Sequence, residues 1–123
     1  MAKVLIVDDN RFFRELLCQM FNGEPDFEVC GEAENGKEAV EKALRLDPDV
    51  VILDLVMPVM NGIEFLRHLR KEPGGEGPTV VFCTVENKID AIREALDAGA
   101  DEYIMKPFDG DIIAAKFAEA GLL

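Results

Sequence analysis

Polar residues directly follow four short apolar runs in this 123-residue chain. They are two adjacent acids, a third acid, a hydroxyl and an amine: Asp8 and Asp9, Asp54, Thr84 and Lys106. Carboxylates that share a partly buried cleft repel one another, and the loss of hydration adds to the cost. A hard divalent cation relieves both, and Mg²⁺ prefers one or two carboxylates together with water and a phosphate oxygen. The acids therefore indicate a candidate magnesium site.

These residue types together suit phosphoryl transfer. A lysine ammonium is a compact charge for a phosphoryl oxygen, Thr84 offers a hydroxyl donor, and a carboxylate such as Asp54 can act as the nucleophile. Taken singly, each residue has an ordinary explanation: Asp8 and Asp9 suit a turn or a helix cap, and Lys106 suits a side chain that extends from a strand end into solvent. Their coincidence at four run ends favours one joint site.

The apolar runs that precede these residues have the character of strands buried on both faces. They are rich in Val and Ile and lie at residues 3–7, 27–30, 50–53, 79–83 and 102–105. Apolar residues recur at helical spacing between and after the runs, which predicts five helices. The residues suited to cap their N-termini are Asn10, Asn35, Asn61, Asn87 and Asp109. Gly99 stands where a left-handed residue would end the fourth helix.

The alternation of strands and helices predicts an α/β fold. It is of the (βα)5 type, with one doubly wound five-stranded parallel sheet and helices on both faces. The carboxyl ends of parallel strands meet at one edge of such a sheet, which is where these folds bind ligands. We therefore expect the polar residues after the apolar runs to converge at that edge.

Composition excludes several classes of partner. The chain has 13 Lys and Arg against 25 Asp and Glu, a net charge of −12, so we expect no nucleic-acid binding. No apolar stretch approaches the roughly 18 residues of a membrane span, and the N-terminus has no signal-peptide pattern, which predicts a cytoplasmic protein without membrane insertion. Cys18, Cys30 and Cys83 lack metal-ligand spacing and are predicted to be buried, reduced thiols.

A basic segment, LRHLRK, lies within the third predicted helix. His68 invites a role as a phosphoryl carrier, but its place away from the acidic residues favours a solvated helix face. Arg67, Arg70 and Lys71 are predicted to belong to the same solvated face.

Four motifs together resemble those of the response-regulator receiver family, in its single-domain, chemotaxis CheY-like form. They are VLIVDDN at 4–10, VILDLVMPVMNG at 51–62, VVFCT at 80–84 and YIMKP at 103–107. The resemblance covers essentially the whole chain and implies one receiver domain over residues 1–123. It also implies a flavodoxin-like, CheY-like sheet with the strand order 2-1-3-4-5.

The resemblance implies a role for each matching position. The phosphoryl group is carried by Asp54, as 4-aspartylphosphate. The Mg²⁺ ligands are Asp8, Asp9, Asp54 and the main-chain carbonyl of Val56. The catalytic residues are Asp54, Lys106 and Thr84, and the switch residues are Thr84 and Tyr103. The resemblance implies that a sensor histidine kinase donates the phosphoryl group. It also implies that the protein is a signalling switch rather than a metabolic enzyme, since it supports only its own phosphorylation and dephosphorylation.

The recipient of the signal stays open between alternatives. The second half of the chain looks like chemotaxis CheY proteins, which implies docking of the fourth helix and fifth strand onto an effector such as a flagellar motor switch protein. The first half looks more like receivers joined to transcription factors or methylesterases, so a receiver fragment of a larger regulator is the alternative. We expect a monomer, with a phosphorylation-dependent dimer as the alternative.

Two other classes of protein share parts of this pattern. A flavodoxin-like electron carrier has the same topology but needs a loop rich in Ser, Thr and Gly after its first strand, where this chain has DDNRFF. A Mg²⁺-dependent phosphatase with an aspartate nucleophile usually has a second acid two residues later, where this chain has Val56. Both classes are therefore disfavoured.

Overall fold

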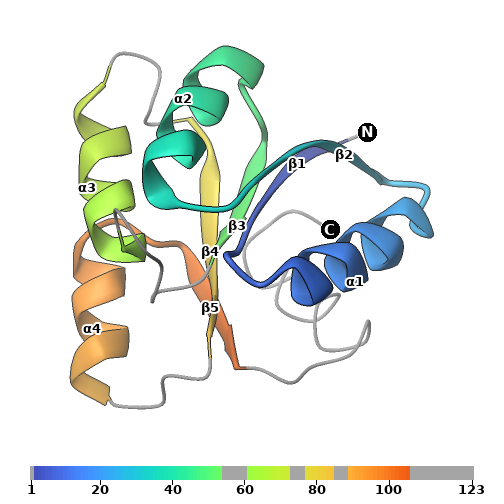
Figure 1. Ribbon diagram of the computed structural model, residues 1–123. Helices are drawn as coiled ribbons and strands as arrows, with labels where there is room; N and C mark the ends of the chain where they lie inside the picture. Colours follow the sequence, from blue (N-terminus) through green and yellow to red (C-terminus); the bar gives the residue numbers. More distant parts are fainter. Residues whose placement is uncertain (1, 54–60, 73–76, 85–88, 106–123) are drawn as a thin grey trace.

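A computed structural model describes residues 2–53, 61–72, 77–84 and 89–105 (Figure 1). The five strands are β1 (Ala2–Val7), β2 (Phe27–Ala33), β3 (Val50–Leu53), β4 (Thr79–Thr84) and β5 (Glu102–Met105). The helices between them are α1 (Arg11–Asn22), α2 (Gly36–Leu46), α3 (Gly62–Lys71) and α4 (Ile89–Asp97). The predicted alternation of strands and helices is confirmed for these residues, and the predicted fifth helix lies outside them.

The strands form one parallel sheet in the order β2-β1-β3-β4-β5, which confirms the predicted order. Val7 at the end of β1 pairs with Ala33 on one side and with Leu53 on the other. Leu53 in turn pairs with Phe82 of β4. The carboxyl ends of β1, β2 and β3 are therefore level with one another, as a site shared by several strands requires.

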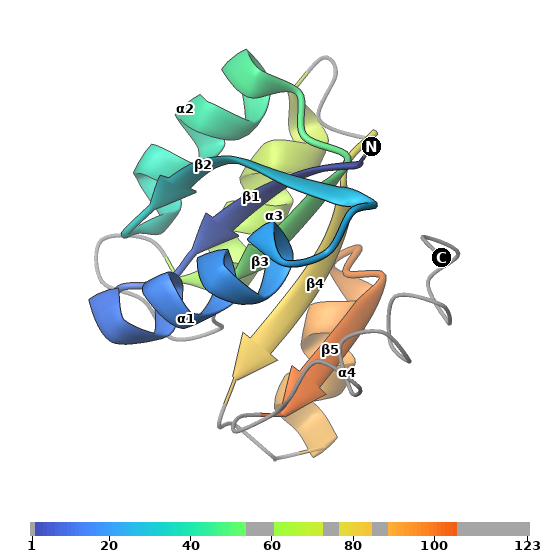
Figure 2. The ribbon, with the colours of Figure 1, turned by 90° about the vertical axis from the view of Figure 1, so that its right-hand side faces the viewer.

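Helices cover both faces of the sheet, with α1 on one face and α2, α3 and α4 on the other (Figures 1 and 2). Because alternate residues of a strand point to opposite faces, Val4 and Ile6 pack on the α1 side and Leu5 and Val7 pack on the other. All four residues of β3 are buried. Each fully buried side chain of this kind contributes about 1.5–3 kcal/mol, so the sheet is a rigid support for the residues at its edge.

Three of the predicted helix caps are confirmed. Asn10, Asn35 and Asn61 precede α1, α2 and α3, and each side-chain oxygen accepts the N–H of the third residue on, at 3.1, 2.9 and 2.9 Å. Gly99 has a φ of +112°, the left-handed conformation predicted for it. Asn87 and Asp109 lie outside the described residues.

The prediction of a solvated face on α3 is correct for His68 and wrong for Arg70. His68 and Arg67 are exposed. Arg70 is only 20% exposed, and its guanidinium donates to the main-chain carbonyls of Pro78 and Gly99 at 2.8 and 3.2 Å. It turns inward because the connections that lead into β4 and β5 present carbonyls that need donors.

The cysteines also differ in part from the prediction. Cys18 and Cys30 are free thiols, as expected, but both are half-buried rather than buried. Cys30 lies on β2, an edge strand of the sheet, and Cys18 lies on the flank of α1 near that strand, so neither is covered on all sides. The side chain of Cys83 lies outside the description. Within the described ranges, no helix combines the length and the apolar character that crossing a membrane requires.

Candidate functional site

The carboxyl end of β1 brings two carboxylates to the edge of the sheet. Asp8 is 1% exposed, whereas Asp9 is exposed. The main-chain N–H of Asp8 donates to the carbonyl of Ala33 at 3.1 Å, which continues the pairing of β1 with β2. Its carboxylate oxygen Oδ1 accepts the N–H of Asn10 at 2.8 Å. One acid is therefore held inside the fold while its neighbour reaches solvent.

These two acids fit a magnesium ion by their chemistry. Burial of a carboxylate costs several kcal/mol unless hydrogen bonds or an opposite charge compensate it. Asp8 and Asp9 supply hard oxygen donors, in the number that Mg²⁺ commonly takes from a protein. No third His, Cys, Asp or Glu joins them in a possible metal-binding group among the residues that the structure describes.

The other predicted site residues are placed only in part. Asp54, Val56 and Lys106 lie outside the described residues. Thr84 is the last residue of β4 and pairs with Met105, the last residue of β5. Tyr103 pairs with Phe82 in the same two strands, and the side chains of Thr84 and Tyr103 lie outside the description. The backbone thus brings the ends of β4 and β5 to the same edge as Asp8, while the roles of these side chains stay predictions.

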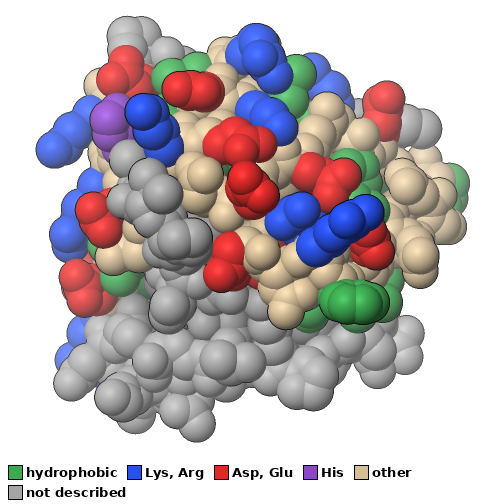
Figure 3. Space-filling model, in the orientation of Figure 1, with side chains coloured by type: hydrophobic (Ala, Val, Ile, Leu, Met, Phe, Trp, Pro, Cys, Tyr) green, Lys and Arg blue, Asp and Glu red, His purple; other side chains and the backbone are tan. Residues whose placement is uncertain are grey.

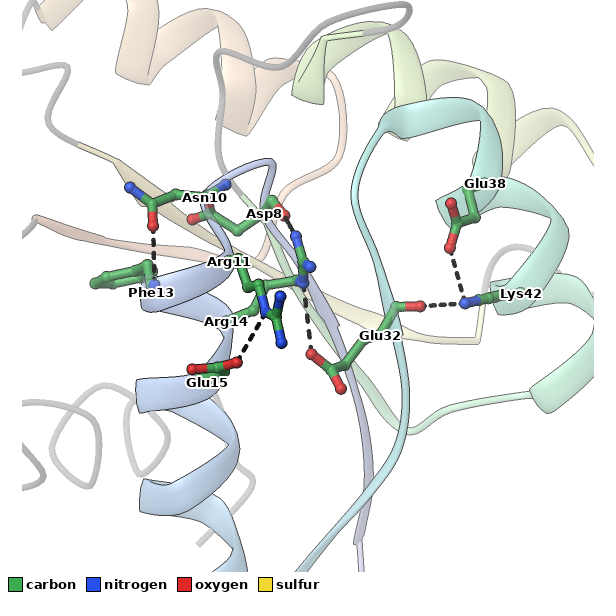
Figure 4. A network of polar contacts seen from close by, with 9 residues as sticks. All are labelled: Asp8, Asn10, Arg11, Phe13, Arg14, Glu15, Glu32, Glu38 and Lys42. Carbon is green, nitrogen blue, oxygen red and sulfur yellow. Dashed lines mark hydrogen bonds and ion pairs between the residues drawn. The ribbon is translucent and has the colours of Figure 1, made fainter.

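A polar network that the sequence pattern did not indicate holds the end of β1 (Figure 4). Arg14 donates through Nη1 to the main-chain carbonyl of Asp8 at 2.7 Å, and its Nε lies 3.4 Å from Oε1 of Glu32. Lys42 on α2 donates to the carbonyl of Glu32 and lies 2.8 Å from Glu38. One signal was available: helical side chains lean toward the N-terminus, so Arg14, six residues after Asp8, can reach back to it.

The same network lines a cleft of about 350 Å³ beside the end of β2. Its lining residues are Arg14, Glu32, Ala33, Glu34, Glu38 and Lys42.

Burial raises the pKa of the Cys18 thiol to about 11, and the nearby Glu32 carboxylate, which accepts the thiol hydrogen bond, adds to the rise. Cys18 is therefore a neutral donor at pH 7, and Glu32 is held by groups from both α1 and α2.

The surface of the molecule carries charges of both signs. Figure 3 shows acidic and basic side chains interspersed on the face that it views. The excess of acids over bases in the whole chain is therefore not gathered into one acidic area on that face.

Comparisons with known proteins agree with this geometry. The family model for the response regulator receiver domain matches residues 4–118. The chain is 44% identical over 109 residues to the chemotaxis protein CheY of Halobacterium salinarum, and the match covers 88% of each. It is also 44% identical over 108 residues to the protein-glutamate methylesterase/protein-glutamine glutaminase of Aliivibrio fischeri, where it covers 87% of this chain but only 28% of that protein.

A solved structure adds the same result for the fold. The CheX–CheY–BeF3–Mg²⁺ complex from Borrelia burgdorferi contains a chain that superimposes with a TM-score of 0.85 at 32% identity. The superposition covers 93% of this chain and 84% of that one. The similarity in fold therefore extends over most of this chain.

Proposed function

The chain belongs to the response regulator receiver domain family, and from that premise we propose that it is a phosphorylation-driven switch with Asp54 as its acceptor. Receiver domains generally bind Mg²⁺ at the phosphorylation site and interact with histidine kinases and downstream effectors. The observation that carries the proposal for this chain is the pair formed by buried Asp8 and exposed Asp9. It stands at the end of β1, and Val7 before it is paired with Leu53, the residue that precedes Asp54.

In the proposed reaction, a sensor histidine kinase donates the phosphoryl group from a phosphohistidine. The P–N bond breaks with its electron pair remaining on the imidazole, and a P–O bond forms to a carboxylate oxygen of Asp54. Lys106 contacts the phosphoryl group, and the hydroxyl of Thr84 donates a hydrogen bond to a phosphoryl oxygen. Asp8, Asp9, Asp54 and the Val56 carbonyl would hold Mg²⁺. The bound ion would neutralise part of the charge on the phosphoryl oxygens.

The proposed switch follows from the charge that phosphorylation adds. An aspartyl phosphate brings about −1.5 to −2 charge and strong acceptor oxygens to the end of the sheet. Thr84 moves toward it and Tyr103 turns into the vacated space, which changes the surface of α4, β5 and the predicted fifth helix and shifts an existing two-state equilibrium. The neighbouring ends of β4 and β5 support this proposal, since both residues belong to those strands.

A protein effector is the proposed recipient of the signal. The similarity to a chemotaxis CheY over 88% of both chains supports a single-domain chemotaxis switch, with a flagellar motor switch protein as a candidate recipient. The similarity to methylesterases, of which the chain spans 28%, supports the alternative of a receiver portion of a larger regulator. One receiver domain over residues 1–123, a monomeric state, a location in the cytoplasm and the lack of a metabolic activity stay parts of this proposal.

The decisive experiment is incubation with acetyl phosphate and Mg²⁺, followed by mass measurement of the intact protein. We expect one added phosphoryl group that is labile to base, absent when EDTA replaces Mg²⁺ and absent in Asp54→Asn. Asp97→Asn is the matched control, since it removes an exposed acid from α4 and should be labelled like the wild type. An unlabelled wild type, or equal labelling of Asp54→Asn, would refute the proposal.

A further inference from the structure

We propose that Arg14 is a positioning residue for the Asp8–Asp9 pair. Its guanidinium ties the main-chain carbonyl of Asp8, at the end of β1, to the carboxylate of Glu32 on β2. In this role Arg14 contacts neither the phosphoryl group nor the cation, and it acts by fixing the turn from which the two acids project. The inference rests on the proposed magnesium site.

The burial of Arg14 distinguishes it from the other arginine at the start of α1. Its side chain is 15% exposed, the lowest value among the cations that form ion pairs in the described ranges. Arg11, three residues earlier, is 82% exposed, and its partner among the described residues is Glu15 on its own helix, at 3.0 Å. Figure 4 shows the contrast, with Arg14 reaching toward Asp8 and Glu32 while Arg11 reaches Glu15. Desolvation of a guanidinium is costly, so its two partners must compensate it.

Fixing the Asp8 carbonyl also fixes the direction of Asp9. The peptide bond between them is planar, so the orientation of the Asp8 carbonyl sets the orientation of the Asp9 N–H and the path of the next residue. On its other side, Asp8 is held by its N–H bond to Ala33 and by the bond from Asn10 to its carboxylate. Arg14 adds a third restraint, on the main-chain carbonyl of Asp8, which belongs to the peptide bond that leads to Asp9.

Glu32, the second partner of Arg14, is itself held in place by two elements. It pairs with Ile6 in the sheet, and Lys42 from α2 donates to its main-chain carbonyl. A guanidinium has donors that point in fixed, different directions, so it can reach Asp8 and Glu32 at the same time, whereas a lysine ammonium is a single point charge on a flexible stem. The bridge from β1 to β2 therefore requires arginine rather than any cation.

The sign of the effect on Mg²⁺ binding separates positioning from electrostatics. A positive charge near two carboxylates repels a divalent cation, so a purely electrostatic role predicts that Arg14→Met binds Mg²⁺ more tightly and that Arg14→Lys binds like the wild type. A positioning role predicts weaker binding in both variants. Loss of an outer partner of a metal site commonly weakens binding 10- to 100-fold, and because Arg14 acts through the backbone we expect about 3- to 10-fold.

The test is a titration of each whole-chain variant with Mg²⁺ in the absence of a phosphodonor. The change in amide NMR chemical shifts during the titration gives the Mg²⁺ affinity. Arg14→Met and Arg14→Lys are compared with Arg11→Met and Arg11→Lys, which make the same substitutions on the same helix and should bind like the wild type. Amide hydrogen exchange of the metal-free proteins is the second measurement, and we expect faster exchange at Asp9 and Asn10 in the Arg14 variants only. The spectra also report whether each variant is folded.

Four outcomes decide the matter. Weaker Mg²⁺ binding in folded Arg14→Lys, with unchanged binding in Arg11→Lys, supports positioning. Wild-type affinity in Arg14→Lys, or tighter binding in Arg14→Met, overturns it while leaving the proposed function intact. A wild type that binds no Mg²⁺ defeats the proposed function as well. Glu32→Gln combined with Arg14→Met should bind no more weakly than Arg14→Met alone, and full additivity of the two changes would remove Glu32 from the proposal.

Discussion

Replacing Arg70 by methionine would remove a guanidinium that joins three separate parts of the chain. Arg70 lies on α3 and donates to the carbonyl of Pro78, just before β4, and to that of Gly99, after α4. It also lies 3.3 Å from Oδ2 of Asp101, which accepts the N–H of Val80 at 2.8 Å. Methionine keeps much of the apolar stem, so the substitution tests the polar head of the side chain.

The expected loss of stability follows from these contacts. Each carbonyl bond contributes about 1 kcal/mol net, toward the middle of the usual range because Arg70 keeps 20% of its exposure. The ion pair with half-exposed Asp101 adds about 0.5 kcal/mol. We expect Arg70→Met to lower the free energy of unfolding by about 2–3 kcal/mol, which corresponds to a fall of roughly 10 °C in the melting temperature of a domain of this size.

Arg67→Met is the matched control, three residues earlier on the same helix. Arg67 is 56% exposed and pairs with Glu94 at 3.6 Å, so its loss should change stability by no more than about 0.5 kcal/mol. Urea unfolding followed by circular dichroism gives both values. Asp101→Asn keeps an acceptor for Val80, and combining it with Arg70→Met should show a coupling of about 0.5–1 kcal/mol. If the losses in free energy of unfolding of Arg70→Met and Arg67→Met differ by less than about 0.5 kcal/mol, the conclusion that the polar contacts of Arg70 stabilise the fold is wrong.

Three further predictions concern the metal, a thiol and the core. Mg²⁺ at about 100 times its Kd should raise the free energy of unfolding by about 2.7 kcal/mol in calorimetry, because only the folded chain binds it, and Asp9→Asn should lose most of that gain; an equal gain would exclude Asp9 as a ligand. The folded Cys18 thiol has a pKa of about 11 against an ordinary 9.0, so it keeps its proton up to a higher pH than the same thiol in the unfolded chain. The stability of the wild type relative to Cys18→Ala should therefore fall as the pH rises from about 9 to about 11 and stay level below 9, and a level difference throughout would contradict the raised pKa. Phe21→Ala should cost about 3–5 kcal/mol in urea unfolding because its ring is buried against Phe27, whereas Phe12→Ala, at a side chain 85% exposed, should cost no more than about 0.5 kcal/mol; similar losses would contradict this placement.

The elements of the fold were predictable because their signals are local. β3 has the predicted limits, 50–53, since four apolar residues between acids fit only a strand buried on both faces. The caps of α1, α2 and α3 needed only an asparagine at the right place. β2 runs to Ala33 rather than ending at Cys30, because an edge strand admits a half-exposed polar residue such as Glu32, which contacts Arg14 of α1 and still pairs with Ile6 of β1.

The candidate site was predictable to the extent that it depends on strand ends. Asp8 and Asp9 follow β1, and the parallel register makes the ends of neighbouring strands level. The difference between them was not predictable from two identical side chains: Asp8 is buried, with a carboxylate oxygen that accepts the N–H of Asn10, whereas Asp9 is exposed, since successive residues point to opposite sides.

The sequence by itself determined the alternation of strands and helices, the helix caps and the set of polar residues that follow the strands, because each of these depends on neighbours within a few residues. Only the tertiary structure decided which arginines link separate parts of the fold. Arg11 and Arg14 lie three residues apart on α1, as do Arg67 and Arg70 on α3, and the four side chains are chemically identical. Arg14 and Arg70 turn inward because Glu32 on β2 and Asp101, just before β5, bring them acceptors from distant parts of the chain, and the sequence around each arginine does not indicate these two distant carboxylates.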